Sequence, residues 1–214
     1  MSRSSSGLIA LSNPASSAAE TFRSLSTVLQ HQHAKSQHPG CKVYLVTSPL
    51  EGEGKTTTIS NLAVTYAQAG KKVLLIDCNL RNPRIADWFN LTPQSGVLDY
   101  LLHHVEPLSL LHGTPIDSLK IIQAGRLRFD PANAGHLDQL EELISALRSQ
   151  FDIILVDTPP VLRYADAQMI ADKCDGVILV VKYGQTKGEL VRKARQSLEQ
   201  VGATVLGVVM NQAK

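Results

Sequence analysis

The sequence has few of the features that mark secreted, membrane-spanning or nucleic-acid-binding proteins. Its three cysteines, Cys41, Cys78 and Cys174, lie far apart with no CxxC spacing, so neither a disulfide framework nor a zinc site is indicated. The N-terminus lacks the segments of a signal peptide, and no apolar run approaches the ~20 residues of a membrane helix. A formal net charge of +2 is too small to indicate nucleic acid as a general partner. We therefore expect a cytoplasmic protein that binds no nucleic acid and reaches a membrane only through a partner.

The rest of the composition is that of a folded globular protein. Apolar residues make up 43% and charged residues 19% of a chain of 214 residues, which is long enough to bury a substantial core. Aromatic residues make up only 5%, so the core should consist mainly of Val, Ile, Leu and Ala. Residues 1–17 are rich in Ser, Ala and Gly. We predict a flexible N-terminus over 1–17, followed by a single domain over 18–214.

Short apolar strands alternate with helices along most of this domain. Strands are predicted over Val43–Thr47, Val73–Ile76, Leu119–Ile122, Ile153–Val156, Val177–Val181 and Val205–Met210. Helices are predicted over Ala18–Leu29, Thr56–Ala69, His136–Ser149, Ala165–Ala171 and Lys187–Val201. The weakest pattern lies between about residues 90 and 135. Continuous apolar strands separated by helices indicate an α/β fold with a parallel sheet covered on both faces.

A glycine-rich loop between the first strand and its helix predicts a site for a nucleoside triphosphate. The loop consists of Gly52, Glu53, Gly54, Lys55, Thr56 and Thr57. Glycine allows positive φ and close backbone approach, so several N–H groups can point at a phosphate. Lys55 supplies a charge for the β- and γ-phosphates, and the Thr56 hydroxyl can bind Mg²⁺. The alternative is a simple glycine-rich turn, and the P-loop pattern is imperfect because Pro49 stands where it has a glycine.

Three polar residues at strand ends support the phosphate site. Asp77 and Asp157 each end an apolar strand, and the carboxyl ends of parallel strands share the sheet edge that carries the glycine-rich loop. Either carboxylate alone could be an ordinary strand terminus, but together with the loop they indicate one metal and phosphate centre. Asn211 follows the last strand and either reads a nucleotide base through its amide or simply caps the strand.

Several further segments resemble the bacterial tyrosine kinases. The run Asp77-Cys78-Asn79-Leu80-Arg81-Asn82-Pro83 resembles their DxDLRxP element, the Walker A′ motif. Asp157-Thr158-Pro159-Pro160 with the later Asp166-Ala167 resembles their DTPP...DA segment. Ala19–Leu25 and Asn61–Ala63 resemble their N-terminal helix and first P-loop helix, so the resemblance extends over about residues 18–211.

This resemblance implies a P-loop kinase domain that works in capsular and exopolysaccharide synthesis and export. Its cofactors would be ATP and Mg²⁺, and its substrates would be protein tyrosines. Its partner would be a membrane-embedded polysaccharide co-polymerase, an adaptor whose cytosolic tail completes the ATP site. On this analogy Lys55 and Thr56 hold phosphate and Mg²⁺, Asp77 activates the attacking tyrosine hydroxyl or orients the metal, and Asp157 binds Mg²⁺ through water. Phosphoryl transfer needs mainly positioning and charge neutralisation from such residues.

One position separates this family from its nearest rivals. The partitioning and division-site ATPases carry a second lysine five residues before the P-loop lysine, which reaches the nucleotide of a dimer partner. Here that position is Leu50. Its lack of charge favours the kinases, with a P-loop ATPase as the weaker alternative.

Three departures from the family pattern bear on activity. Asn79 replaces the second acidic residue of DxD, so we expect weaker metal binding and slower transfer with nucleotide binding retained. In the family, an N-terminal helix with one glutamate and two arginines docks onto a neighbouring subunit in a ring. Glu20 and Arg23 match the first two of these residues, but Ser26 stands in place of the second arginine. Glu20 and Arg23 could instead form a solvated ion pair within the helix. Only three residues follow Asn211, where the family has a tyrosine-rich tail, so either the sequence is truncated there or the chain does not autophosphorylate in the usual way. These departures keep open an ATP-binding regulatory subunit with weak or no kinase activity.

Overall fold

The computed structural model describes residues 7–34, 40–126, 130 and 136–212, which fold around a seven-stranded sheet in the order β3-β4-β2-β5-β1-β6-β7. All neighbouring strands are parallel except β3, which pairs antiparallel with β4. The strands are β1 (Lys42–Thr47), β2 (Val73–Asp77), β3 (His112–Gly113), β4 (Leu119–Ile122), β5 (Ile153–Asp157), β6 (Gly176–Lys182) and β7 (Val205–Asn211). Every residue of β1, β2 and β5 is buried, which explains their continuous apolar sequences.

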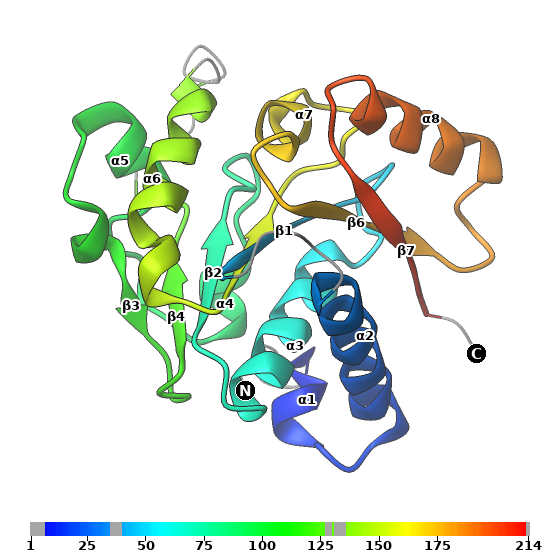
Figure 1. The fold of residues 1–214 in the computed structure, drawn as a ribbon, viewed down its shortest axis with the longest axis horizontal. Helices are drawn as coiled ribbons and strands as arrows, with labels where there is room; N and C mark the ends of the chain where they lie inside the picture. The colour runs from blue at the N-terminus through cyan, green and yellow to red at the C-terminus, as the bar shows by residue number, and fades with distance from the viewer. Residues whose placement is uncertain (1–6, 35–39, 127–129, 131–135, 213–214) are drawn as a thin grey trace.

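Helices cover both faces of the sheet (Figure 1). They are α1 (Ile9–Ser12), α2 (Ser17–Ala34), α3 (Lys55–Gln68), α4 (Ile85–Trp88), α5 (Val97–His103), α6 (Leu140–Leu147), α7 (Asp166–Ala171) and α8 (Gly188–Glu199), with short 3-10 helices η2 (Pro107–Leu110) and η4 (Arg148–Gln150). The predicted α/β fold with helices on both faces is confirmed. All six predicted strands and five predicted helices are present within a few residues of the expected bounds.

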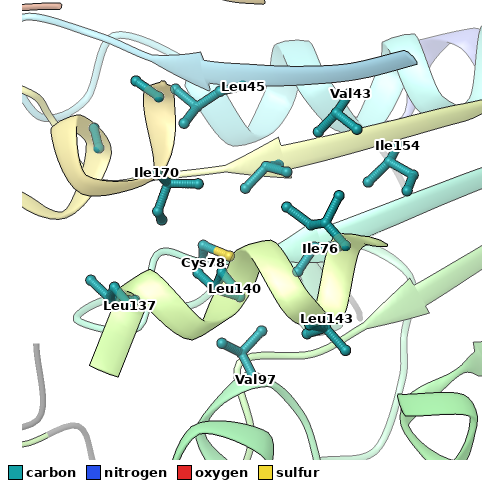
Figure 2. Close-up of a cluster of buried hydrophobic side chains, with 14 of the residues drawn as sticks. Val43, Leu45, Ile76, Cys78, Val97, Leu137, Leu140, Leu143, Ile154 and Ile170 are labelled. Carbon is teal, nitrogen blue, oxygen red and sulfur yellow. The ribbon is translucent and has the colours of Figure 1, made fainter. Parts of the chain in front are cut away.

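Two separate cores result because alternate residues of each strand point to opposite faces. Val43 and Leu45 of β1 belong to the core beneath α5, α6, α7 and α8, whereas Tyr44 and Val46 belong to the core beneath α1, α2, α3 and α4. Figure 2 shows the first core, in which Leu140 of α6 lies near Cys78 and Ile76 at the end of β2. The two cores hold the central strands from both sides and so fix the sheet edge that carries the site.

The N-terminal segment, for which we predict flexibility over residues 1–17, carries a short helix where the structure describes it. Residues 9–12 form α1, and Leu8 and Ala10 are buried against α3. The Ala10 N–H donates to Asn61 Oδ1 at 2.9 Å, which ties the segment to the middle of α3. Residues 1–6 lie outside the described part of the chain.

The weakly patterned region that begins near residue 90 contains α5, η2 and β3, and α4 lies just before it. The sequence analysis anticipated none of these elements. Each of these elements is at most seven residues long, which is too short to give a clear hydrophobic period. In the part of the chain that the structure describes, no helix has both the length and the apolar character needed to cross a membrane.

Candidate active site

The predicted polar residues meet at the carboxyl edge of the parallel sheet. Asp77 at the end of β2 and Asp157 at the end of β5 occupy paired positions in the sheet register, and Val46 of β1 pairs with Asp157 from the other side. The loop that leaves β1 therefore starts beside both carboxylates. This arrangement confirms the expectation that the loop and the two strand ends share one edge.

The loop needs glycine at position 54 for two independent reasons. Gly54 has φ +93°, in the left-handed region that side chains disfavour. A Cβ atom at this position would also lie 1.9 Å from Asn211 Nδ2, because the Asn211 amide donates to the Glu53 carbonyl at 3.0 Å. Gly54 precedes Lys55, the first residue of α3, so the loop leads its N–H groups into the positive end of that helix.

Lys55 is held in the loop rather than extended into water. Its side chain is buried, with 6% exposed, and its ammonium donates to Ser48 Oγ at 3.1 Å. Burial lowers the pKa of Lys55, and the negative charges of Asp157 and Glu53 oppose this shift. A phosphate anion beside this buried ammonium would be favourable, because a charge-assisted contact compensates for its removal from water.

Thr56 and Asp157 form the best-defined polar contact of the site. The Thr56 hydroxyl donates to Asp157 Oδ2 at 2.6 Å. Asp157 is fully buried, and within the described residues its other oxygen, Oδ1, has no hydrogen-bond partner. Burial raises the pKa of Asp157, opposed first by the Thr56 hydrogen bond and then by the Lys55 charge.

This pair of oxygen donors fits the magnesium ion that the resemblance implies. Mg²⁺ prefers oxygen ligands and keeps several waters, so it is bound by one or two carboxylates together with substrate phosphates. The unpartnered Asp157 Oδ1 offers a buried acceptor to a metal-bound water. Among the described residues, no cluster of three or more His, Cys, Asp or Glu side chains could hold a metal by itself.

Asp77 organises the loop that follows β2. Its Oδ1 accepts the Asn79 N–H at 3.2 Å, and its Oδ2 accepts the N–H groups of Arg84 at 3.2 Å and Ile85 at 3.1 Å. Burial raises the pKa of Asp77, and the charge of Asp157 raises it further. The backbone hydrogen bonds oppose this shift and hold the carboxyl group in place.

A cavity of about 640 Å³ opens in front of these residues. Of the predicted phosphate-binding residues, Gly52, Gly54, Lys55, Thr56 and Thr57 line it. Asp77 and Asp157 are not among the residues that line it, and Asp157 reaches it only through its contact with Thr56.

Glu53 and Asn211 were predicted to bind the nucleotide, but their side chains are engaged within the protein. The Glu53 carboxylate is buried, accepting the Leu50 N–H at 2.7 Å and the Thr186 hydroxyl. The Asn211 amide contacts the Glu53 carbonyl as described above, and its Oδ1 accepts the Gln212 N–H at 2.9 Å. Both side chains therefore brace the loop, and any role of Glu53 in phosphate binding rests on its backbone. Leu50, at the position of the rival family's second lysine, is 44% exposed.

The sequence analysis missed the residues that form the wall of the cavity opposite the loop. Arg81 donates to Asp166 at 3.1 Å, and its guanidinium lies 4.3 Å from the centre of the Tyr164 ring. Asp166 is almost fully buried, so this ion pair fixes the loop after β2 against the start of α7. Further residues of the cavity are Glu51, Asn79, Asn82, Arg84, Trp88 and Pro160. Both ends of the ion pair lie in family motifs, but nothing in the sequence indicated that they meet.

The residues predicted for an oligomer interface form an intrahelical pair. Arg23 Nε donates to Glu20 Oε2 at 2.8 Å, and Arg23 Nη2 also donates to the Pro14 carbonyl at 2.9 Å. Both side chains remain substantially exposed, 41% for Arg23 and 65% for Glu20. Their role at an interface stays a prediction.

Comparison with known proteins agrees with this arrangement. Residues 41–214 match the ParA family model, described as NUBPL iron-transfer P-loop NTPase. The chain is 34% identical over 213 residues to tyrosine-protein kinase YwqD of Bacillus subtilis, covering 100% of this chain and 89% of that protein. It is 39% identical over 171 residues to tyrosine-protein kinase CpsD of Streptococcus pneumoniae, covering 79% of this chain and 75% of that one.

A solved structure extends the likeness to the whole described fold. The kinase domain of the Escherichia coli tyrosine kinase ETK superposes with a TM-score of 0.88 at 28% identity, covering 95% of this chain and 79% of that chain. The matches to kinases include the N-terminal helices, whereas the ParA model begins only just before β1. The chain therefore belongs to the bacterial tyrosine-protein kinases, a family built on the P-loop NTPase fold.

Proposed function

We propose that this chain transfers the γ-phosphoryl group of ATP to tyrosine hydroxyls of proteins, in a magnesium-dependent reaction. The observation that carries the proposal is the contact of Thr56 with the buried Asp157 beside Lys55, at the mouth of a cavity large enough for a nucleotide. A glycine-rich turn without function would not need a buried lysine and two buried carboxylates at one sheet edge.

The residues of the chain have distinct roles in this reaction. The loop N–H groups, the start of α3 and the Lys55 ammonium hold the phosphates and balance their charge. Thr56, Asp157 and Asp77 would hold Mg²⁺, which when bound neutralises charge on the transferred group. Asp77, with its raised pKa, is suited to orient or accept the proton of the attacking hydroxyl.

We further propose that the protein acts in capsular or exopolysaccharide synthesis and export. A membrane polysaccharide co-polymerase would serve as its adaptor and hold it at the cytoplasmic face of the membrane. The adaptor's cytosolic tail would contact the exposed rim of the ATP site, where Leu50 and Glu51 lie. The exposed Glu20 and Arg23 of α2 are the groups through which copies of the chain would associate.

A second candidate is an ATP-binding regulatory subunit with little kinase turnover, and Asn79 favours it. Asn79 lines the cavity two positions after Asp77, where the family has an acidic residue. An amide accepts a hydrogen bond from a metal-bound water but adds no negative charge. Nucleotide would then bind and change the state of an export complex without efficient transfer.

The deciding experiment is incubation with Mg²⁺-ATP and a tyrosine-containing peptide, with and without a peptide of the adaptor's cytosolic tail. We expect phosphotyrosine on the peptide, dependent on Mg²⁺ and lost on chelation with EDTA. Tight ATP binding without any phosphotyrosine, even with the adaptor peptide, would reject the kinase and leave the regulatory subunit.

Restoring the acidic residue with Asn79→Asp should raise the rate of phosphotyrosine formation on the order of tenfold. A charged acceptor makes a hydrogen bond to a metal-bound water that is stronger by roughly 1–1.5 kcal/mol than an amide does. The rate is measured at saturating ATP over a range of Mg²⁺ concentrations, and the gain should be largest at low Mg²⁺.

A matched control is Asn82→Asp, which adds the same charge to the same cavity three positions later. It should leave the Mg²⁺ dependence unchanged. If both variants behave alike, or if Asn79→Asp has no effect, Asn79 is not what limits metal binding.

A further inference from the structure

The five tyrosines of the chain differ sharply in accessibility. All lie in the part of the chain that the structure describes. Tyr44, Tyr66 and Tyr100 are buried, with at most 8% of each exposed. Tyr164 is half-buried between the guanidinium groups of Arg81 and Arg163, at 4.3 and 5.3 Å from the centre of its ring. Tyr183, by contrast, is 55% exposed. Among these tyrosines it alone presents its side chain openly to another protein.

Tyr183 lies in the turn between β6 and α8, and this turn is fixed to the phosphate loop. The Tyr183 N–H donates to the Asn211 carbonyl at 2.9 Å. Three residues later, the Thr186 hydroxyl accepts the Lys182 N–H at 3.0 Å and donates to the Glu53 carboxylate. The tyrosine therefore projects from a well-held turn rather than from a loose loop. Its backbone is anchored on the outer side of the phosphate loop, where β6 and β7 form one edge of the sheet (Figure 1).

The surroundings of Tyr183 suit a phosphorylated side chain. Tyr183 shares a hollow of about 420 Å³ with two cationic residues, Lys182 and Arg192. Glu189, in the first turn of α8, forms an ion pair with Lys193, with its Oε1 atom 2.8 Å from Lys193 Nζ. This ion pair partly neutralises the charge of Glu189. A phosphate dianion on Tyr183 would find positive charge nearby and little repulsion.

The same hollow also offers apolar surface for an approaching protein. Val208 and Met210 of β7 line it with 46% and 60% of their surface exposed. These two residues provide apolar contact area beside Tyr183, which a second kinase molecule can cover while the Tyr183 hydroxyl lies in its active site.

We infer that Tyr183 is an acceptor tyrosine, phosphorylated by a second copy of this chain. This inference rests on the proposed kinase function. Tyr183 does not line the cavity that contains Lys55 and Thr56, so the transfer takes place between molecules. The Tyr183 hydroxyl oxygen forms a bond to the γ-phosphorus of ATP bound to the other copy. The bond from that phosphorus to the β–γ bridging oxygen breaks, and ADP leaves with the electron pair. The hydroxyl proton passes to Asp77 of the copy that holds ATP, and from there to water.

The test uses the full chain incubated with Mg²⁺-ATP, followed by mapping of phosphotyrosine by mass spectrometry. We expect Tyr183 to carry most of the incorporated phosphate. Tyr183→Phe should lose at least about four-fifths of the self-incorporation, while its rate on an added tyrosine peptide stays within about twofold of the parent. Tyr100→Phe, which removes a buried hydroxyl, serves as the control and should incorporate phosphate normally.

Transfer between molecules is tested by mixing the parent chain with a size-tagged Lys55→Met acceptor that cannot use ATP itself. The tagged acceptor should become phosphorylated at Tyr183. Phosphorylation of the peptide with none at Tyr183 would overturn this inference and leave the kinase proposal standing. No phosphotyrosine on either peptide or chain would overturn both.

Discussion

Lys55→Met is expected to weaken ATP binding by about 100-fold or more without unfolding the protein. A charge-assisted contact between ammonium and phosphate in a buried site is worth about 2–3 kcal/mol, which corresponds to this factor. Methionine has a similar length and no charge, so it can fill the same buried space. Burial lowers the pKa of Lys55, so its charge is costly in the ligand-free protein, and the attraction of Asp157 and Glu53 offsets part of that cost. Removal of the charge should therefore change thermal stability little.

The measurement is calorimetric titration with Mg²⁺-ATP, together with thermal unfolding in the absence of ligand. Lys71→Met, which neutralises an exposed lysine just after α3, is the matched control and should bind ATP normally. An ATP affinity for Lys55→Met equal to that of the parent would show that the phosphates do not bind at this loop.

Asp157→Asn is expected to lower the rate of phosphoryl transfer and, in the ligand-free protein, to increase stability at alkaline pH. The loss of activity should be about 10- to 100-fold, the effect typical of removing a group that contacts a metal through water. The asparagine oxygen can still accept the Thr56 hydroxyl, so the loop keeps its shape.

The gain in stability follows from the pKa of the buried carboxyl group. Burial raises the pKa of Asp157 in the folded chain above the value of about 4 in the unfolded chain. The folded state then binds more protons than the unfolded state, so the free energy of unfolding decreases as pH rises from about 4 through the folded pKa. Asparagine carries no titrating proton and removes this decrease. The loss of compensation for the nearby Lys55 charge offsets part of the gain.

Urea unfolding without nucleotide at pH 5 and pH 8 measures this effect. The parent should lose stability between the two pH values, and Asp157→Asn should lose less. Asp138→Asn, at an exposed position, is the control and should follow the parent. Equal pH dependence in the parent and in Asp157→Asn would contradict the assignment of a costly buried charge.

The sequence was sufficient to predict six of the seven strands and the meeting of the glycine-rich loop with Asp77 and Asp157 at one sheet edge. The apolar strands ending in Asp77 and Asp157 are recognisable because buried parallel strands have continuous apolar sequences. The sharing of one edge follows from the direction of parallel strands alone. The positions of Lys55 and Thr56 follow equally from a local pattern, since the loop and the start of α3 are adjacent in sequence.

The remaining parts of the site depend on contacts between distant segments. Arg81 and Asp166 are 85 positions apart, and their pairing requires α7 to begin beside the loop after β2. Glu53 lies 133 positions from Thr186, and its inward direction is set by that contact rather than by the loop motif. Local patterns contain no information on such contacts, so the sequence could not show what the Glu53 side chain contacts.

The contact between Asn211 and the phosphate loop has a consequence for the order of events during synthesis. Glu53 emerges from the ribosome early, but Asn211, 158 positions later, is made near the end of the described chain. Domains generally fold as units as they are synthesised, and this loop can take its final form only after β7 has been added to the sheet. An incomplete nascent chain would therefore lack the hydrogen bond from Asn211 that braces the phosphate loop.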